Sequence, residues 1–245
     1  MRATLGVVVT VFALTGAACS TNRAATNPKP APATTTTASP TTPTANPAAA
    51  ASDTTRSTVR APCPVVMAEQ EPQDISAQTV PVTRTVVTHY YAIHGSSPTQ
   101  LRTQMNQCGP IADGRENDAF TKWLVNWQVF DRDGNGCGIG GLAIHVRVDM
   151  YLPQWTDVAP PDLERRWNTY IAALTSHEDG HVAHGFGAAE RVYRTLVRLP
   201  PAATCAQLNA GAAAAARVVV GSFGALDVTY DEETRHGATQ GAIFP

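Results

Sequence analysis

Apolar residues follow two different periods along the chain, and these divide its folded part into a strand region and a helical region. Residues 84–94 (RTVVTHYYAIH), 121–130 (TKWLVNWQVF) and 139–152 (IGGLAIHVRVDMYL) are rich in β-branched and aromatic residues, which favours strands. The last two segments bracket the turn-rich DRDGNGCG, so we expect them to pair as a long β-hairpin.

The first predicted helix lies between the first two predicted strands. Residues 97–107 (SPTQLRTQMNQ) predict a short helix, with Ser97 as its cap, Pro98 at its first position, and Leu101 and Met105 on one face. After two prolines, residues 162–199 show apolar side chains at helical spacing until a second pair of prolines ends the pattern.

A second long helix is expected over residues 204–234, although glycines at 211, 221 and 224 leave its continuity open. The chain therefore predicts an α+β fold, a small N-terminal antiparallel β-sheet followed by two long helices that pack on it.

The N-terminus has the features of an exported protein. Residues 1–19 combine a short basic start, an apolar run and a small-residue region before Cys19, which predicts a signal peptide. Cys19 directly follows GAA, as in a bacterial lipobox, so we expect lipidation of Cys19 and anchoring at the outer face of the cell membrane; free secretion is the alternative. Residues 20–60 are rich in Thr, Ala and Pro and predict a disordered tether, which leaves residues 61–245 as one folded domain.

Charge and cysteine content narrow the function classes further. The formal net charge is −2 and no basic block occurs, which argues against a nucleic-acid partner. Four cysteines of the mature part lie far apart without a C-x-x-C motif, so we expect two disulfides. Of the three connectivities, Cys137–Cys205 with Cys63–Cys108 is favoured, because the first bridge would tie the last helix to a strand.

The segment HEDGH, residues 177–181, has the form H-E-x-x-H inside the first long predicted helix. Residues four apart on an α-helix differ by about 40° around its axis, so His177 and His181 project from the same face. Two imidazoles placed in this way can bind one zinc ion, and Glu178 is displaced sideways, where its carboxylate can hold a water molecule. The alternative interpretation is a polar, solvated helix face.

Gly180 lies inside this motif and costs about 1 kcal/mol of helix stability relative to Ala. Such a glycine is expected where another segment crosses the helix closely, and that segment could supply a third ligand. His184 and Glu190 are alternative ligands on the same helix. An ion held between His177 and His181 cannot easily reach a side chain a further turn along, so we expect both to lie outside the ligand set.

The sequence resembles the bacterial DUF922 family, whose members are predicted to be secreted zinc-dependent proteases. The matching features are YYAIHG, LPQW, W-x-x-Y-x-x-x-L-x-x-HEDGH and the ending YDEETRHGATQGAIFP, over about residues 80–245. The resemblance implies a zincin-like site on the H-E-x-x-H helix, with a further metal ligand from the RHG segment, residues 235–237.

His236 in that segment is the expected third zinc ligand, because two histidines on one helix occupy only one side of a tetrahedron. Gly237 would let the backbone turn tightly toward the surface of Gly180. Asp231 is expected to orient a ligand imidazole or, as the alternative, to bind the metal itself.

The expected function is hydrolysis of peptide bonds in the cell envelope or outside the cell by a zinc metallopeptidase, with a protein or peptide as substrate. Glu178 would take a proton from water and pass it to the leaving amine. Tyr230, Arg235 and His184 are candidates to stabilise charge on the carbonyl oxygen of the substrate. Two alternatives use the same histidines: a zinc-containing envelope module that binds or scaffolds without catalysis, and an amidase that acts on cell-wall peptides.

Overall fold

The computed structural model describes residues 8–13, 63, 65–70, 81–112, 114–134 and 136–244. The predicted lipidation site Cys19 and the predicted tether, residues 20–60, lie outside these ranges. In chain order the elements are β1 (Val8–Ala13), β2 (Val65–Gln70), β3 (Val82–Ile93), α1 (Pro98–Cys108), β4 (Ile111–Ala112), β5 (Arg115–Glu116), β6 (Phe120–Gly134), β7 (Gly136–Trp155), α2 (Pro161–Leu196), α3 (Cys205–Thr234) and the 3-10 helix η1 (Ala238–Gln240).

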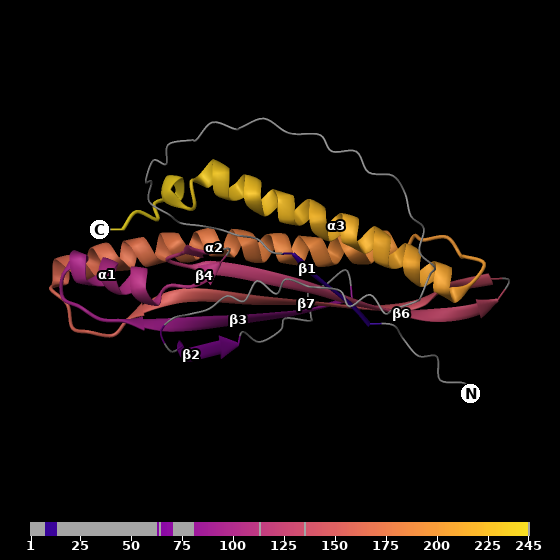
Figure 1. The fold of residues 1–245 in the computed structure, drawn as a ribbon, viewed down its shortest axis with the longest axis horizontal. Coiled ribbons are helices and arrows are strands. Elements are labelled where there is room, and N and C mark those ends of the chain that lie inside the picture. The colour runs from indigo at the N-terminus through magenta and orange to yellow at the C-terminus, as the bar shows by residue number, and fades with distance from the viewer. Residues whose placement is uncertain are drawn as a thin grey trace, which may run out of the picture.

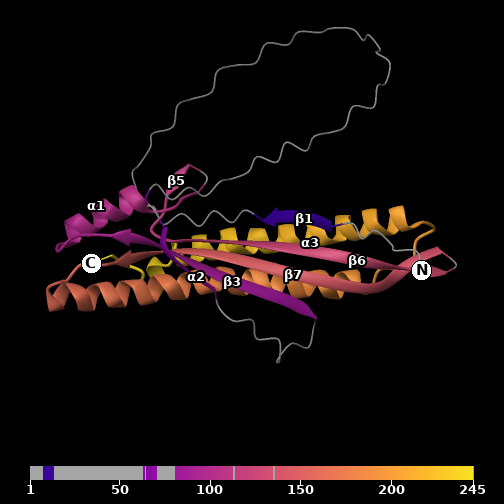
Figure 2. The ribbon, with the colours of Figure 1, turned by 90° about the horizontal axis from the view of Figure 1, so that it is seen from below.

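The described elements form two layers, a five-stranded sheet and a pair of long helices. The strands have the order β1-β6-β7-β3-β2, and β4 and β5 form a separate two-stranded ribbon. Figure 1 shows α2 and α3 lying lengthwise over one face of the sheet, and Figure 2 shows the same arrangement from the strand side. A β-sheet followed by two long helices agrees with the fold predicted from the sequence.

One part of that prediction is wrong, because the sheet is mixed and not antiparallel throughout. β3 and β7 pair in parallel from Val82↔Ile144 to Ile93↔Trp155. After β3 the chain passes through α1 and the β4–β5 ribbon before β6 and β7 form their hairpin, and β7 inserts between β6 and β3. A parallel pair needs such a crossover connection, and its direction cannot be deduced from the alternation within each strand.

The β6–β7 hairpin is confirmed, and it provides the surface on which the helices pack. Alternate residues of the two strands are buried and lie opposite one another, as in Trp123↔Val148, Val125↔Val146 and Trp127↔Ile144. This alternation gives the sheet one apolar face, and α2 contacts both strands.

The predicted helix starts are also confirmed. The Ser97 hydroxyl accepts a hydrogen bond from the backbone N–H of Gln100 at the start of α1, and Thr204 does the same for Gln207 at the start of α3. α3 continues through all three of its glycines, and of the described helices it alone is long and apolar enough to cross a membrane. Here its buried face includes two acidic side chains, Asp227 and Asp231.

Both favoured disulfides are present. Cys63 pairs with Cys108 at the end of α1, and Cys137 at the start of β7 pairs with Cys205 at the start of α3. Two backbone hydrogen bonds between Cys137 and Ala202 lie beside the second bridge. The start of α3 is therefore fixed to the sheet by a disulfide, and the segment just before it by backbone hydrogen bonds.

β1 belongs to the segment predicted to be a signal peptide. In the structure it pairs antiparallel with β6, from Val8↔Gln128 to Ala13↔Trp123, at the edge of the sheet. Removal of residues 1–19 would therefore leave β6 as the edge strand.

Substitution of two glycines by alanine is predicted to change stability in opposite directions. A Cβ on Gly185 of α2 would lie 2.8 Å from Cβ and Cγ of Trp123, so Gly185→Ala is expected to destabilise the fold by about 1–3 kcal/mol. Gly211 of α3 has nothing within 4 Å of such a Cβ, so Gly211→Ala is expected to stabilise by about 0.5–1 kcal/mol. Urea unfolding of the two variants measures both changes, and a destabilised Gly211→Ala variant would contradict this packing.

Candidate metal centre

The candidate site lies between the two long helices, where two pairs of side chains face each other. His177 and His181 come from α2, and Asp227 and Asp231 come from α3, and the members of each pair are four positions apart in the sequence. Because this spacing places both members on one side of a helix, each pair projects into the α2–α3 interface. Three of the four side chains are fully buried, and Asp231 is 3% exposed.

Three ligand atoms of this group converge. Asp231 Oδ1 lies 3.2 Å from His177 Nε2 and 3.0 Å from His181 Nε2. All three atoms lie within 4.8 Å of one another, so the group could hold a metal ion.

The other nitrogen of each imidazole is fixed by an acceptor outside this group. The Nδ1–H of His181 donates to Asp227 Oδ1 at 2.7 Å, and that of His177 donates to Gln240 Oε1 at 2.9 Å. Asp227 is itself oriented by the indole N–H of Trp123, which donates to Oδ2 at 2.9 Å. Outer hydrogen bonds of this kind select the tautomer and turn Nε2 toward the centre.

The residues present fit a cation. With its proton on Nδ1, His177 directs the Nε2 lone pair at the carboxylate of Asp231, and two electron-rich atoms this close repel each other unless a positive charge lies between them. Burial alone would lower the pKa of His181, but its hydrogen bonds to Asp227 and Asp231 raise it to about 10. The site thus attracts a proton when no metal is bound, and two imidazoles with a carboxylate match the ligands that zinc accepts.

Glu178 lies next to this group and is fully buried. Burial raises the pKa of its carboxyl group, while the neighbouring His181 and the hydroxyl of Thr121 on β6 act in the opposite direction. A carboxylate with a raised pKa, close to a possible metal, is suited to accept a proton.

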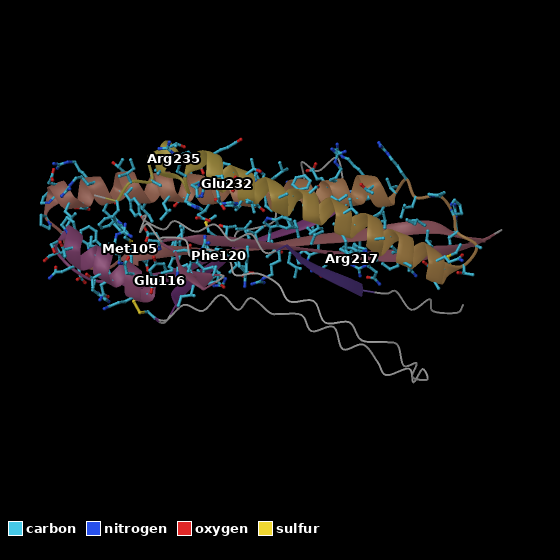
Figure 3. The ribbon with its side chains drawn as sticks, turned by 45° about the horizontal axis from the view of Figure 1, so that its top comes forward. Met105, Glu116, Phe120, Arg217, Glu232 and Arg235 are labelled. Carbon is cyan, nitrogen blue, oxygen red and sulfur yellow. A yellow bond between two sulfur atoms is a disulfide. The ribbon has the colours of Figure 1, made fainter. Side chains whose placement is uncertain are left out.

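A cleft of about 990 Å³ opens beside the metal ligand candidates. Asp231 and His236 lie in its wall, together with the C-terminal segment after η1. Figure 3 shows its two sides, with Met105 and Glu116 on the α1 and β5 side and Glu232 and Arg235 at the end of α3. A bound molecule in this cleft would therefore meet the carboxylate side of the candidate centre.

The geometry reverses the order of the two candidates for the third ligand. His236 is not part of the converging group, and its Nδ1 lies 3.9 Å from Asp231 Oδ1. Its side chain is 31% exposed, whereas that of Asp231 is 4% exposed. The sequence favours His236 as third ligand, with Asp231 as the alternative. In the structure Asp231 has the better position, because it comes from the helix that faces His177 and His181 directly.

Gly180 occupies the place where the second helix crosses. A Cβ at this position would overlap the ring of Tyr230 on α3, which confirms the expected close approach of another segment. Gly237 is expected to turn the backbone toward the surface of Gly180, and in the structure it meets α2 at His177, three residues before Gly180. It has φ +82° and lies against His177, where a Cβ would be 3.0 Å from Cγ of the imidazole.

The three candidates for carbonyl stabilisation take different positions. The ring of Tyr230 stacks on that of His177 with centroids 5.0 Å apart, and its hydroxyl donates to the backbone carbonyl of His177. His184 donates from Nδ1 to Asp227 Oδ1 at 2.8 Å, so it shares that carboxylate with His181. Of the three, only Arg235 lines the cleft.

Two further groups of potential ligands occur among the described residues. His181, His184 and Asp227 form one, which has the same residue types as the first and shares His181 with it; here both imidazoles donate from Nδ1 to Asp227 Oδ1. Asp131 lies close to Cys137 and Cys205 in the other, but these cysteines form a disulfide and offer no thiolate.

The sequence did not lead us to expect Asp227 and Gln240, which accept hydrogen bonds from Nδ1 of His181 and His177. A signal for Asp227 existed, because it stands four residues before Asp231 in a mostly apolar part of the last predicted helix and so repeats the spacing of the histidines. Gln240 gave no such signal, because its place follows from the backbone turn after α3.

Comparison with known proteins identifies the family to which the chain belongs. No curated protein and no solved structure matches the chain. The model of a family described as a bacterial protein of unknown function, DUF922, matches residues 88–237. This range includes the sheet strands β6 and β7, the H-E-x-x-H helix and both aspartates, and we conclude that the chain belongs to the DUF922 family.

Proposed function

We propose that the protein is an exported zinc-dependent metallopeptidase that hydrolyses peptide bonds in the cell envelope or outside the cell. One observation carries the proposal: two imidazole nitrogens and one carboxylate oxygen converge from two helices, beside a buried glutamate and a cleft. His177, His181 and Asp231 would be the protein ligands.

The chemistry divides between the ion and the side chains. A bound zinc ion supplies Lewis acidity, which polarises a carbonyl group and lowers the pKa of water. Glu178 accepts a proton and passes it to the leaving amine, and its raised pKa suits both steps. Arg235, which lines the cleft, is the best placed of the three candidates to donate to the carbonyl oxygen.

The number of converging donors favours catalysis over a scaffold. Structural zinc sites usually have four protein ligands, whereas catalytic sites have three and keep one position open. Three donors converge among the described residues, and a purely structural site would not need Glu178 buried beside them.

Export is supported by the two disulfides, which persist in oxidising compartments and are rare in the cytosol. The signal-peptide pattern of residues 1–19 points the same way. We propose lipidation at Cys19, which would hold the domain at the outer face of the cell membrane through the Thr/Pro/Ala-rich segment.

Exchange of the third ligand should lower zinc affinity strongly. Asp231→Ala removes the converging carboxylate. We expect the zinc affinity of this variant to fall by more than the roughly 10–100-fold that is typical when an outer partner of a ligand is removed. The zinc affinity of His236→Ala should fall by less than about 10-fold. Competition with a chromogenic chelator measures both. If Asp231→Ala binds zinc tightly and His236→Ala loses most of its zinc affinity, His236 is the third ligand and the assignment of Asp231 is wrong.

Zinc binding at neutral pH should release protons. The pKa of His181 in the metal-free protein is raised to about 10, so at pH 7 its Nε2 carries a proton that must leave before the nitrogen can bind a metal. We expect release of about one proton per zinc ion, and an affinity that rises as the pH increases toward 10. Calorimetry in buffers of different ionisation enthalpy measures the release, and a proton count near zero would contradict this protonation state.

Replacement of the buried glutamate should separate catalysis from metal binding. Glu178→Gln is expected to lower peptide hydrolysis by about 10²–10⁴-fold and leave the zinc content unchanged, because the carboxylate acts on protons and does not ligate. Asp179→Asn is the matched control, since Asp179 is the next residue along α2 and is exposed.

The substrates for this assay are an unfolded protein, a peptide library and cell-wall peptides. Hydrolysis of the cell-wall peptides alone would favour the amidase. A zinc-loaded wild-type protein that cleaves none of these substrates would favour the non-catalytic scaffold and contradict the proposed activity.

A further inference from the structure

The chain after α3 turns back to the candidate centre and contacts His177 through two residues, Gly237 and Gln240. Arg235, His236 and Gly237 have φ values of 50°, 53° and 82°, a left-handed run that reverses the direction of the backbone. Non-glycine residues rarely adopt this conformation, and it persists only where surrounding contacts hold it. Gly237 then lies against the imidazole of His177, and η1 places Gln240 beside it.

Gln240 closes a ring of hydrogen bonds with His177 and Tyr230. The Nδ1–H of His177 donates to Gln240 Oε1 at 2.9 Å, and Gln240 Nε2 donates to the hydroxyl of Tyr230 at 2.9 Å. That hydroxyl donates in turn to the backbone carbonyl of His177 at 3.2 Å. Every donor in the ring has an acceptor, so the amide of Gln240 has one favoured orientation, with its oxygen toward the imidazole.

Phe244 anchors the end of this segment. Its ring meets that of Tyr170 edge to face with centroids 5.4 Å apart, and that of Trp167 at 6.4 Å. The guanidinium of Arg102 lies 4.3 Å from the centroid of the Phe244 ring and is held by two hydrogen bonds to Asp118. The preceding residue, Ile243, is 69% exposed, so the anchoring depends on Phe244.

We propose that the C-terminal segment, residues 237–244, contributes to metal binding at the centre. Gln240 is a positioning residue for His177, and Phe244 anchors the segment that carries Gln240. The amide oxygen of Gln240 keeps the proton of His177 on Nδ1 and thereby leaves Nε2 free to bind metal. This inference rests on the metal-binding part of the proposed function and not on hydrolysis.

The first test compares glutamine variants. Gln240→Ala should lose zinc affinity by about 10–100-fold, the range for removal of an outer partner of a ligand histidine. Gln240→Glu keeps an acceptor oxygen and should restore most of that loss. Gln207→Ala is the matched control, because Gln207 is exposed at the start of α3 and uses its backbone N–H for the helix cap.

The second test concerns the anchor. Phe244→Ala should lower zinc affinity by about 10-fold, because it frees the segment that carries Gln240. Val218→Ala is the matched control and should bind zinc as the wild type does, because Val218 is an exposed apolar residue of α3 outside this segment and outside the cleft. The visible spectrum of Co²⁺ in each variant reports ligand geometry independently of activity, and we expect it to change in Gln240→Ala and Phe244→Ala alone. Far-UV circular dichroism of the metal-free variants establishes that each retains its helices.

These measurements distinguish the two proposals. Zinc affinity and Co²⁺ spectra of Gln240→Ala equal to those of Gln207→Ala would overturn the role of the C-terminal segment, whatever the activity. The expected losses in a protein that hydrolyses no peptide would support the segment and contradict the peptidase. Wild-type protein that binds neither Zn²⁺ nor Co²⁺ would overturn both.

Discussion

The contact between two histidines and two aspartates inside the α2–α3 interface is the constraint on which the rest of the structure depends. Charged groups removed from water are costly unless each is paired and hydrogen-bonded. His177, His181, Asp227 and Asp231 meet this condition together, since each imidazole contacts Asp231 and each has a second acceptor behind it. The pairing requires the two helices to approach closely and in one register.

Small residues on α2 make this approach possible. Gly180 accommodates the ring of Tyr230, and Gly187 accommodates Phe223, where a Cβ would lie 2.8 Å from the phenylalanine ring. The Cys137–Cys205 bridge fixes the start of α3 to the sheet. A shift of α3 by one turn would move Asp227 to the place of Asp231, so the anchor at the start of the helix affects the composition of the centre at its far end.

The part of the site that could be predicted from the sequence is the part built from local spacing. His177, Glu178 and His181 belong to one helix, and helical geometry alone places them together. Asp231 and Asp227 depend on the register between two helices, and Gln240 depends on a left-handed turn through Arg235 and His236, two residue types that give no sign of it. The same distinction holds for the fold, where the β6–β7 hairpin followed from a local turn but the parallel pairing of β3 with β7 did not.

Diffraction from crystals soaked in zinc, recorded at the zinc absorption edge, tests the centre most directly. We expect one anomalous peak in the α2–α3 interface, about 2.0–2.2 Å from His177 Nε2, His181 Nε2 and a carboxylate oxygen of Asp231, with Glu178 outside ligand distance. A peak bound by His236 in place of Asp231, or no peak between the helices, would contradict the assignment.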